Sequence, residues 1–181
     1  MNLNLHSSDF ELFGLPEQFA QDRAAIDERW KELQREVHPD KFAAQGASAQ
    51  RVAMQWSVRV NEAYQRLRDP LQRAAHLCER RGAPINAETN TAMSSDFLLE
   101  QMAWREALDD ARGEGDLDGL VTQLTAARSN TLAQIEALLD ATGDAPAAAC
   151  QVRALMFIER FADDVEARFE QFDTQSMDRP R

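Results

Sequence analysis

Val37-His38-Pro39-Asp40-Lys41-Phe42 separates two stretches that have helical periodicity. Upstream of it, apolar side chains recur at the spacing of one helix face: Ile26, Trp30, Leu33 and Val37. Downstream, the same spacing holds for Val52, Trp56, Val60, Ala63 and Leu67. Pro39 interrupts any helix that runs through the stretch. We therefore predict an antiparallel helical hairpin whose loop displays His38 and Asp40, with its first helix from about Arg23 to Val37 and Asp22 as N-cap.

Two plainer interpretations of His38-Pro39-Asp40 have to be weighed. Proline and aspartate are common turn formers, so the three residues taken alone are also typical of a simple turn. One histidine near one carboxylate is also a minimal metal or acid–base site. No second histidine or cysteine lies at ligand spacing, which argues against a metal.

The composition limits the class of protein. The 181 residues are 44% hydrophobic, which is enough for one larger domain or two small ones. No apolar run is long enough to span a membrane, and Met1 to Phe10 lacks the pattern of a secretory signal. Cys78 and Cys150 lie far apart without a Cys-x-x-Cys unit, so we expect ordinary, mostly buried thiols and no structural metal. These features predict a cytoplasmic protein.

Negative charge is concentrated in the second part of the chain. Residues 1–76 carry 10 basic and 11 acidic side chains, whereas residues 77–181 carry 10 basic and 20 acidic ones. This asymmetry favours two modules with different partners, and the acidic half argues against nucleic acid. We predict a first module at 1–76, a connecting segment at 77–94, a three-helix module at 95–173 and a flexible tail at 174–181.

The second module is predicted to be an antiparallel bundle of three helices. They run from Ser95 to about Arg112, from Asp116 to about Ala141, and from Pro146 to about Phe172, with short glycine-containing connections. No strand pattern is present, so the fold class is all-α. Expected core positions are Phe97, Trp104, Leu108 and Ala111 on the first helix, and Leu155, Ile158, Ala162, Val165 and Phe169 on the last.

The first bundle helix has a second apolar face. Leu98, Leu99 and Met102 lie on another side of this helix, in a row that Glu106 and Asp110 continue. On the last helix, Phe157 lies about a quarter-turn from the core stripe. One helix of a three-helix bundle needs only one buried stripe, so the second face calls for another partner. Packing against the first module, or a wide core stripe, is an equal alternative from periodicity alone.

The hairpin and its loop resemble the J-domain, the co-chaperone module that stimulates DnaK-type ATPases. The resemblance rests on His38 to Phe42 between two helices, and on Asn61-Glu62-Ala63-Tyr64 in the second helix. It implies that His38, Pro39 and Asp40 contact the chaperone. It also implies that positive side chains meet an acidic surface of the ATPase: Lys31, Arg35 and Lys41, with Arg29 as a weaker candidate. From charge alone, a solvated surface is the alternative.

The whole chain resembles the HscB family of J-type co-chaperones of iron–sulfur cluster biogenesis. Leu12-Phe13-Gly14-Leu15-Pro16, the His38 stretch, and Phe97-Leu98-Leu99-Glu100-Gln101-Met102 followed by Arg105-Glu106 carry this resemblance. It implies that the first module engages the DnaK-type chaperone HscA and that the bundle binds the scaffold IscU. The positions that match scaffold-binding positions are Leu98, Leu99, Met102, Glu106, Asp110 and Phe157. Ala103 and Asp110 depart from the family pattern, which implies a weaker acidic contribution.

The function expected from this resemblance is delivery of IscU to HscA with stimulation of its ATP hydrolysis. We expect no catalysis by this chain and no cofactor, because no nucleophile elbow, phosphate-cradling glycine loop or ligand cluster is present. A general J-protein that delivers unfolded clients to DnaK is the nearest alternative. A helical adaptor without an ATPase partner is a more distant one.

Overall fold

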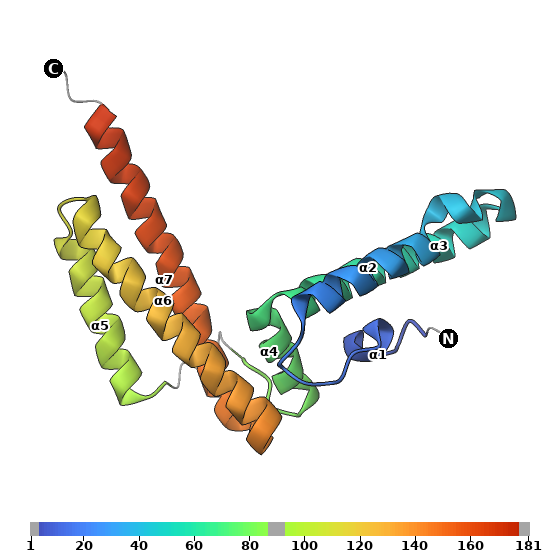
Figure 1. Ribbon diagram of the computed structural model, residues 1–181, viewed down its shortest axis with the longest axis horizontal. Helices are drawn as coiled ribbons and strands as arrows, with labels where there is room; N and C mark the ends of the chain where they lie inside the picture. The colour runs from blue at the N-terminus through green and yellow to red at the C-terminus, as the bar shows by residue number, and fades with distance from the viewer. Residues whose placement is uncertain (1–3, 87–92, 178–181) are drawn as a thin grey trace.

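The computed structural model describes residues 4–86 and 93–177, and its regular structure is helical throughout. One arm is the hairpin of α2 (Arg23–Val37) and α3 (Ala47–Arg68). The other is the bundle of α5 (Ser95–Asp110), α6 (Glu114–Glu136) and α7 (Ala145–Met177). The arms diverge from a shared base that contains α4 (Pro70–Arg80), and α1 (Asp9–Phe13) lies beside the hairpin (Figure 1). The predicted all-α class, a hairpin module plus a three-helix bundle, is confirmed, with no strand among the described residues.

The hairpin forms largely as its periodicity predicts. α2 begins after Asp22, whose carboxylate accepts a hydrogen bond from the Ala24 N–H at 2.9 Å. The buried stripes consist of Ile26, Leu33 and Val37 on α2 and of Ala53, Val60, Ala63 and Leu67 on α3. The prediction for Val52 was wrong, because Val52 is 48% exposed and Ala53 only 3%. One residue is about 100° of helix rotation, so the adjacent position faces α2 instead.

The stretch between α2 and α3, where we expected a loop, forms a 3₁₀ helix, η1 (Pro39–Gln45). Pro39 occupies the first turn of η1. Backbone N–H groups in a first turn have no partner within the helix, so proline loses no hydrogen bond there. Gly46 then takes φ 92°, in the left-handed region that favours glycine, and the chain turns into α3. The tip of the hairpin therefore has a defined shape of its own.

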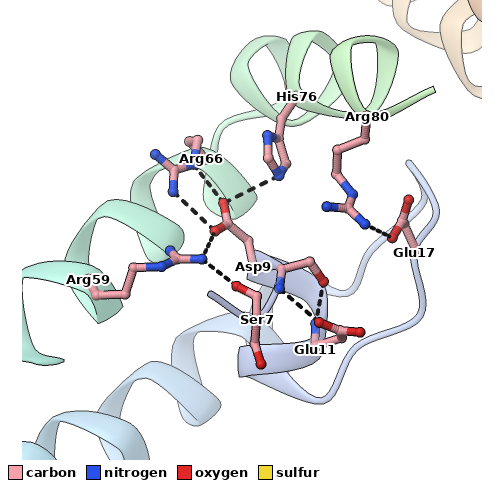
Figure 2. A network of polar contacts seen from close by, with 9 residues as sticks. Ser7, Asp9, Glu11, Glu17, Arg59, Arg66, His76 and Arg80 are labelled. Atoms are coloured by element: carbon pink, nitrogen blue, oxygen red, sulfur yellow. Dashed lines mark hydrogen bonds and ion pairs between the residues drawn. The ribbon is translucent and has the colours of Figure 1, made fainter. Parts of the chain in front are cut away.

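Asp9 fastens α1 to the base of the hairpin (Figure 2). Its carboxylate, 1% exposed, accepts hydrogen bonds from Arg66 Nε at 2.6 Å and Nη2 at 3.0 Å, and pairs with Arg59 Nη2 at 2.7 Å. His76 Nε2 on α4 lies 3.7 Å from the same carboxylate. Burial lowers the pKa of His76, so the ring is neutral at pH 7. One buried carboxylate thus ties α1 to α3, with His76 of α4 beside it.

The bundle packs around side chains from all three of its helices: Trp104, Leu117, Leu124, Ile158, Phe161 and Val165. The prediction for Ala162 was wrong, since Ala162 is exposed and its neighbour Phe161 is 4% exposed. α7 also continues to Met177, past the expected end at Phe172. The first part of the expected tail is therefore helical, and residues 178–181 lie outside the described residues.

A single apolar core joins the two arms. Leu77 and Cys78 of α4 are fully buried in the same cluster as Ile135, Leu139 and Leu155 from the second arm. The expected module boundary at residue 76 therefore lies inside α4, within this joint. Burial raises the pKa of the Cys78 thiol to about 11, so it is an inert core group. Of the expected connecting segment, residues 87–92 lie outside the described residues.

Directional polar contacts cross the same joint. Asp140 lies on η2 (Ala137–Thr142), a π-helical extension of α6, and its two carboxylate oxygens accept the N–H groups of Phe19 at 2.7 Å and Ala20 at 2.8 Å. Arg81 Nη1 donates to the carbonyl oxygen of Leu139 at 2.5 Å. Hydrogen bonds have narrow angular preferences, so they constrain the angle between the arms more tightly than apolar packing does.

We expect Asp140→Asn to lower the free energy of unfolding by about 1–2 kcal/mol, because an amide offers only one acceptor oxygen to the two N–H groups. Asp144→Asn is the matched control. Asp144 accepts the Ala147 N–H at 3.0 Å at the start of α7, and asparagine serves equally well at such a position. Urea denaturation followed by circular dichroism measures both variants. Equal effects of the two changes would contradict a special role for Asp140.

Candidate functional site

The tip of the hairpin presents the Asp40 carboxylate to solvent. The His38 Nδ1 accepts the Asp40 N–H at 3.3 Å and so caps η1, while the Lys41 N–H donates to the His38 carbonyl oxygen at 3.0 Å. The Asp40 side chain is 91% exposed and that of His38 is 55% exposed. The His38 Nδ1 also lies 3.6 Å from Asp40 Oδ2, on the exposed side of the tip. The Asp40 carboxylate is therefore free to accept hydrogen bonds from a partner.

Basic side chains continue this surface along α2. Arg35, His38 and Lys41, together with Gln34, line one shallow groove at the tip, and Lys31 is exposed one turn from Arg35. Lys31, Arg35 and Lys41 make no ion pair with any residue in the described part of the chain. Arg29, the weaker candidate, pairs with Glu32 at 2.9 Å. The structure thus places Arg35 and Lys41 around one groove with His38. We call the six residues Lys31, Arg35, His38, Pro39, Asp40 and Lys41 the tip surface.

The second apolar face of α5 is exposed. Leu98, Leu99 and Met102 are 46%, 65% and 67% exposed, and Glu106 and Asp110 extend the same row in solvent. Trp104 of this helix and Ala111, its C-cap residue, already lie in the bundle core. The alternative that the row packs against the first module is therefore wrong for its three apolar members. We call the five residues Leu98, Leu99, Met102, Glu106 and Asp110 the α5 face.

Phe157 lies at the seam between α5 and α7 and is half-buried. Its ring is 5.9 Å from that of Phe97, edge to face, and 5.8 Å from that of Phe161, stacked. The alternative of a wide core stripe therefore holds in part for this residue. Phe157 borders the bundle core and is less available to a partner than the α5 face.

Two residues near Phe157, Arg105 and Met156, had no role in the sequence analysis. The Arg105 guanidinium lies 5.5 Å from the centre of the Phe157 ring, and Met156 is 38% exposed. Arg105 follows Met102 by three positions and Leu98 by seven, a helical spacing that places it beside the α5 face. That spacing was visible in the sequence, but the contact with Phe157 on another helix was not.

The described residues bear on the expectations for metal ligands, free thiols and membrane spans. No group of three histidine, cysteine, aspartate or glutamate side chains is placed to hold a metal ion within residues 4–86 and 93–177. The expectation that both thiols are mostly buried was wrong for Cys150, which is exposed and accepts a hydrogen bond from Arg153 Nη2 at 3.0 Å. In the same described ranges, no helix has the length and apolar character needed to cross a bilayer.

Comparisons with known proteins relate both arms to one family. Residues 93–166 match the family model described as the HSCB C-terminal oligomerisation domain. The co-chaperone protein HscB homologues of Burkholderia vietnamiensis and Burkholderia multivorans are each 49% identical over 175 residues. Each alignment covers 95% of this chain and 99% of the relative.

Solved structures show the same arrangement of helices. The chaperone HscB from Vibrio cholerae is 36% identical, with a TM-score of 0.78, and the match covers 91% of this chain and 99% of that one. The human co-chaperone protein HscB superimposes with a TM-score of 0.85 at 23% identity, over 92% of this chain and 84% of that one. The human protein is therefore similar in fold alone.

Proposed function

The chain belongs to the HscB family of co-chaperones, and from this premise we propose that it delivers the iron–sulfur scaffold IscU to the DnaK-type chaperone HscA and stimulates ATP hydrolysis by HscA. The observation that carries the proposal is the exposed α5 face on a bundle whose core is already complete. A helix with an exposed apolar row beside acidic residues is suited to a partner protein. We further propose that this takes place in the cytoplasm.

The tip surface is our proposed contact with HscA. The exposed Asp40 carboxylate can form charge-assisted hydrogen bonds with a cationic or backbone donor of the chaperone. Lys31, Arg35 and Lys41 would meet an acidic surface and speed the encounter. The chain itself performs no chemistry in this proposal. The chaperone has one conformation that hydrolyses ATP and one that does not. This chain binds the hydrolysing conformation more tightly and so raises its population.

The α5 face, with Phe157 at its edge, is our proposed contact with IscU. Burying Leu98, Leu99 and Met102 supplies most of the affinity, because each large apolar side chain contributes about 1.5–3 kcal/mol when fully removed from water. Glu106 and Asp110 form a polar rim. Because the two arms share one core, a bound scaffold is held near the chaperone at an effective concentration on the order of millimolar.

We expect Leu98→Ala/Leu99→Ala/Met102→Ala to weaken IscU binding at least roughly 100-fold, because the triple variant removes the exposed apolar atoms of the α5 face. Single-turnover ATP hydrolysis by HscA, with and without IscU, measures the consequence. Wild type and IscU should stimulate synergistically, and the variant should lose the synergy while keeping the stimulation seen without IscU.

Val121→Ala is the control for this experiment. Val121 is 42% exposed on α6 of the same bundle but outside the α5 face, so its loss should leave the synergy unchanged. The proposal would be contradicted if the wild type stimulated ATP hydrolysis by HscA equally with and without IscU, and if the triple variant gave the same stimulation as the wild type. That outcome would favour a general J-protein that delivers unfolded clients to DnaK.

A further inference from the structure

Arg105 is the one basic residue of α5 and lies at the boundary between the α5 face and the seam with α7. The helix also carries five acidic residues: Asp96, Glu100, Glu106, Asp109 and Asp110. Arg105 is exposed and makes no ion pair with any residue in the described ranges 4–86 and 93–177. Arg105 is therefore the one positive charge on a helix that is otherwise negatively charged.

The guanidinium of Arg105 has a defined position although it lacks an acidic partner. It lies 5.5 Å from the centre of the Phe157 ring, whose other neighbours are Phe97 and Phe161. A guanidinium over an aromatic ring is attracted by the negative face of the ring, yet its N–H groups remain able to donate at its edge. The contact thus positions a cation without using its hydrogen-bond donors.

Charge complementarity identifies the chemistry that this position recognises. A scaffold carboxylate that approached the α5 face near Glu106 or Asp110 would be repelled, whereas one placed beside Arg105 would form a charge-assisted, two-pronged hydrogen bond. The attraction and the repulsion together favour one position of the scaffold along the α5 face. A purely apolar row has no such preference, because apolar burial is non-directional.

We propose that Arg105 is a specificity-determining residue, which pairs with a carboxylate of the scaffold at the edge of the apolar contact. The inference rests on the proposed function, because it assumes that the α5 face binds the scaffold. It adds a positively charged position to a surface whose expected polar residues, Glu106 and Asp110, are both acidic. The alternative is that Arg105 only covers the Phe157 ring.

Arg105→Met separates the two roles, because methionine keeps an apolar stem over Phe157 but removes the charge. We expect this variant to bind the apo form of the cognate IscU-type scaffold about tenfold more weakly at low salt. The deficit should shrink to about twofold at high salt, where the pair in the wild type is screened. Isothermal titration calorimetry at roughly 0.05 M and 0.5 M NaCl provides both values.

Two further variants sharpen the test. Arg105→Lys keeps the charge but lacks the planar guanidinium group. Its affinity for the scaffold should therefore lie between those of the wild type and Arg105→Met. Arg112→Met removes an exposed arginine after the end of α5 and should bind like the wild type at both salt concentrations. The near-ultraviolet circular dichroism of the three tryptophans, of which Trp104 is buried in the bundle core, checks that each variant is folded.

Either of two results would overturn the role of Arg105. One is wild-type affinity for Arg105→Met at low salt, and the other is the same loss of affinity at both salt concentrations, which indicates packing alone. If the wild-type chain itself does not bind the scaffold, the proposed function fails and this inference fails with it. The two failures are therefore distinguishable in a single set of titrations.

Discussion

We expect Asp40→Asn to reduce the stimulation of HscA by about two orders of magnitude, because the charge-assisted bonds of the carboxylate would be lost. The Asp40 side chain is 91% exposed and supports no other part of the fold. The capping bond of η1 uses the Asp40 backbone N–H, which the substitution keeps. Stability and IscU binding should therefore remain at wild-type values, which thermal denaturation and calorimetry can check.

Glu36→Gln is the matched control for Asp40→Asn. Glu36 is exposed on the last turn of α2, close to the tip surface, so this change also removes one negative charge from the same region. It should leave ATP hydrolysis by HscA at its stimulated rate. Full stimulation by Asp40→Asn would mean that the tip surface does not work as a J-domain loop.

We expect Asp9→Asn to lower the free energy of unfolding by about 3 kcal/mol at pH 7. The carboxylate is 1% exposed, and its removal would leave Arg59 and Arg66 beside a neutral amide. α1 would then be held mainly by its apolar side chains. Asp22→Asn is the control, because asparagine caps a helix as well as aspartate does. A loss below 1 kcal/mol in urea denaturation would show that the guanidinium groups find other partners.

The effect of Asp9 should depend on pH in a defined direction. Burial raises the pKa of the Asp9 carboxyl, but the hydrogen bonds and charges of Arg66 and Arg59 outweigh this, so the pKa lies below its ordinary value of 3.8. A group with a lowered folded pKa stabilises the protein fully above its unfolded pKa. Apart from a change due to His76, whose pKa the Asp9 charge raises, the stability difference between wild type and Asp9→Asn should be constant from pH 7 to 5. It should shrink as the pH falls below 3.8 and through the folded pKa.

Residues on one helix were predicted well, and contacts between distant helices were not. The spacing of Ile26, Leu33 and Val37 identified a buried face correctly, because a periodic pattern reports which side chains share one side of a helix. Val52 and Ala162 were wrong, since each lies one position from the residue that is buried. Periodicity predicts the edge of a buried stripe only to within about one residue. The position of the neighbouring helix decides which of two adjacent side chains is buried.

The same distinction, between residues close in the chain and contacts between distant helices, applies to the candidate sites. His38, Pro39 and Asp40 could be predicted as one site from the sequence because they are adjacent in the chain. Arg105 belongs to a motif that carries the family resemblance, but its contact with Phe157 joins two helices and has no signal in the sequence. The link of Asp140 to Phe19 spans 121 residues and left no local signal at either end.

Local chemistry in the sequence by itself determined the helices, the interrupted stretch at Pro39 and the existence of a second apolar face on α5. Each depends on residues within a few turns of one another, for which spacing and backbone restrictions are sufficient. Only the tertiary structure decided that Leu98, Leu99 and Met102 are uncovered, that Phe157 is half-buried and that Asp9 is enclosed. Burial is a property of the neighbours that pack against a side chain, and those neighbours come from distant parts of the chain.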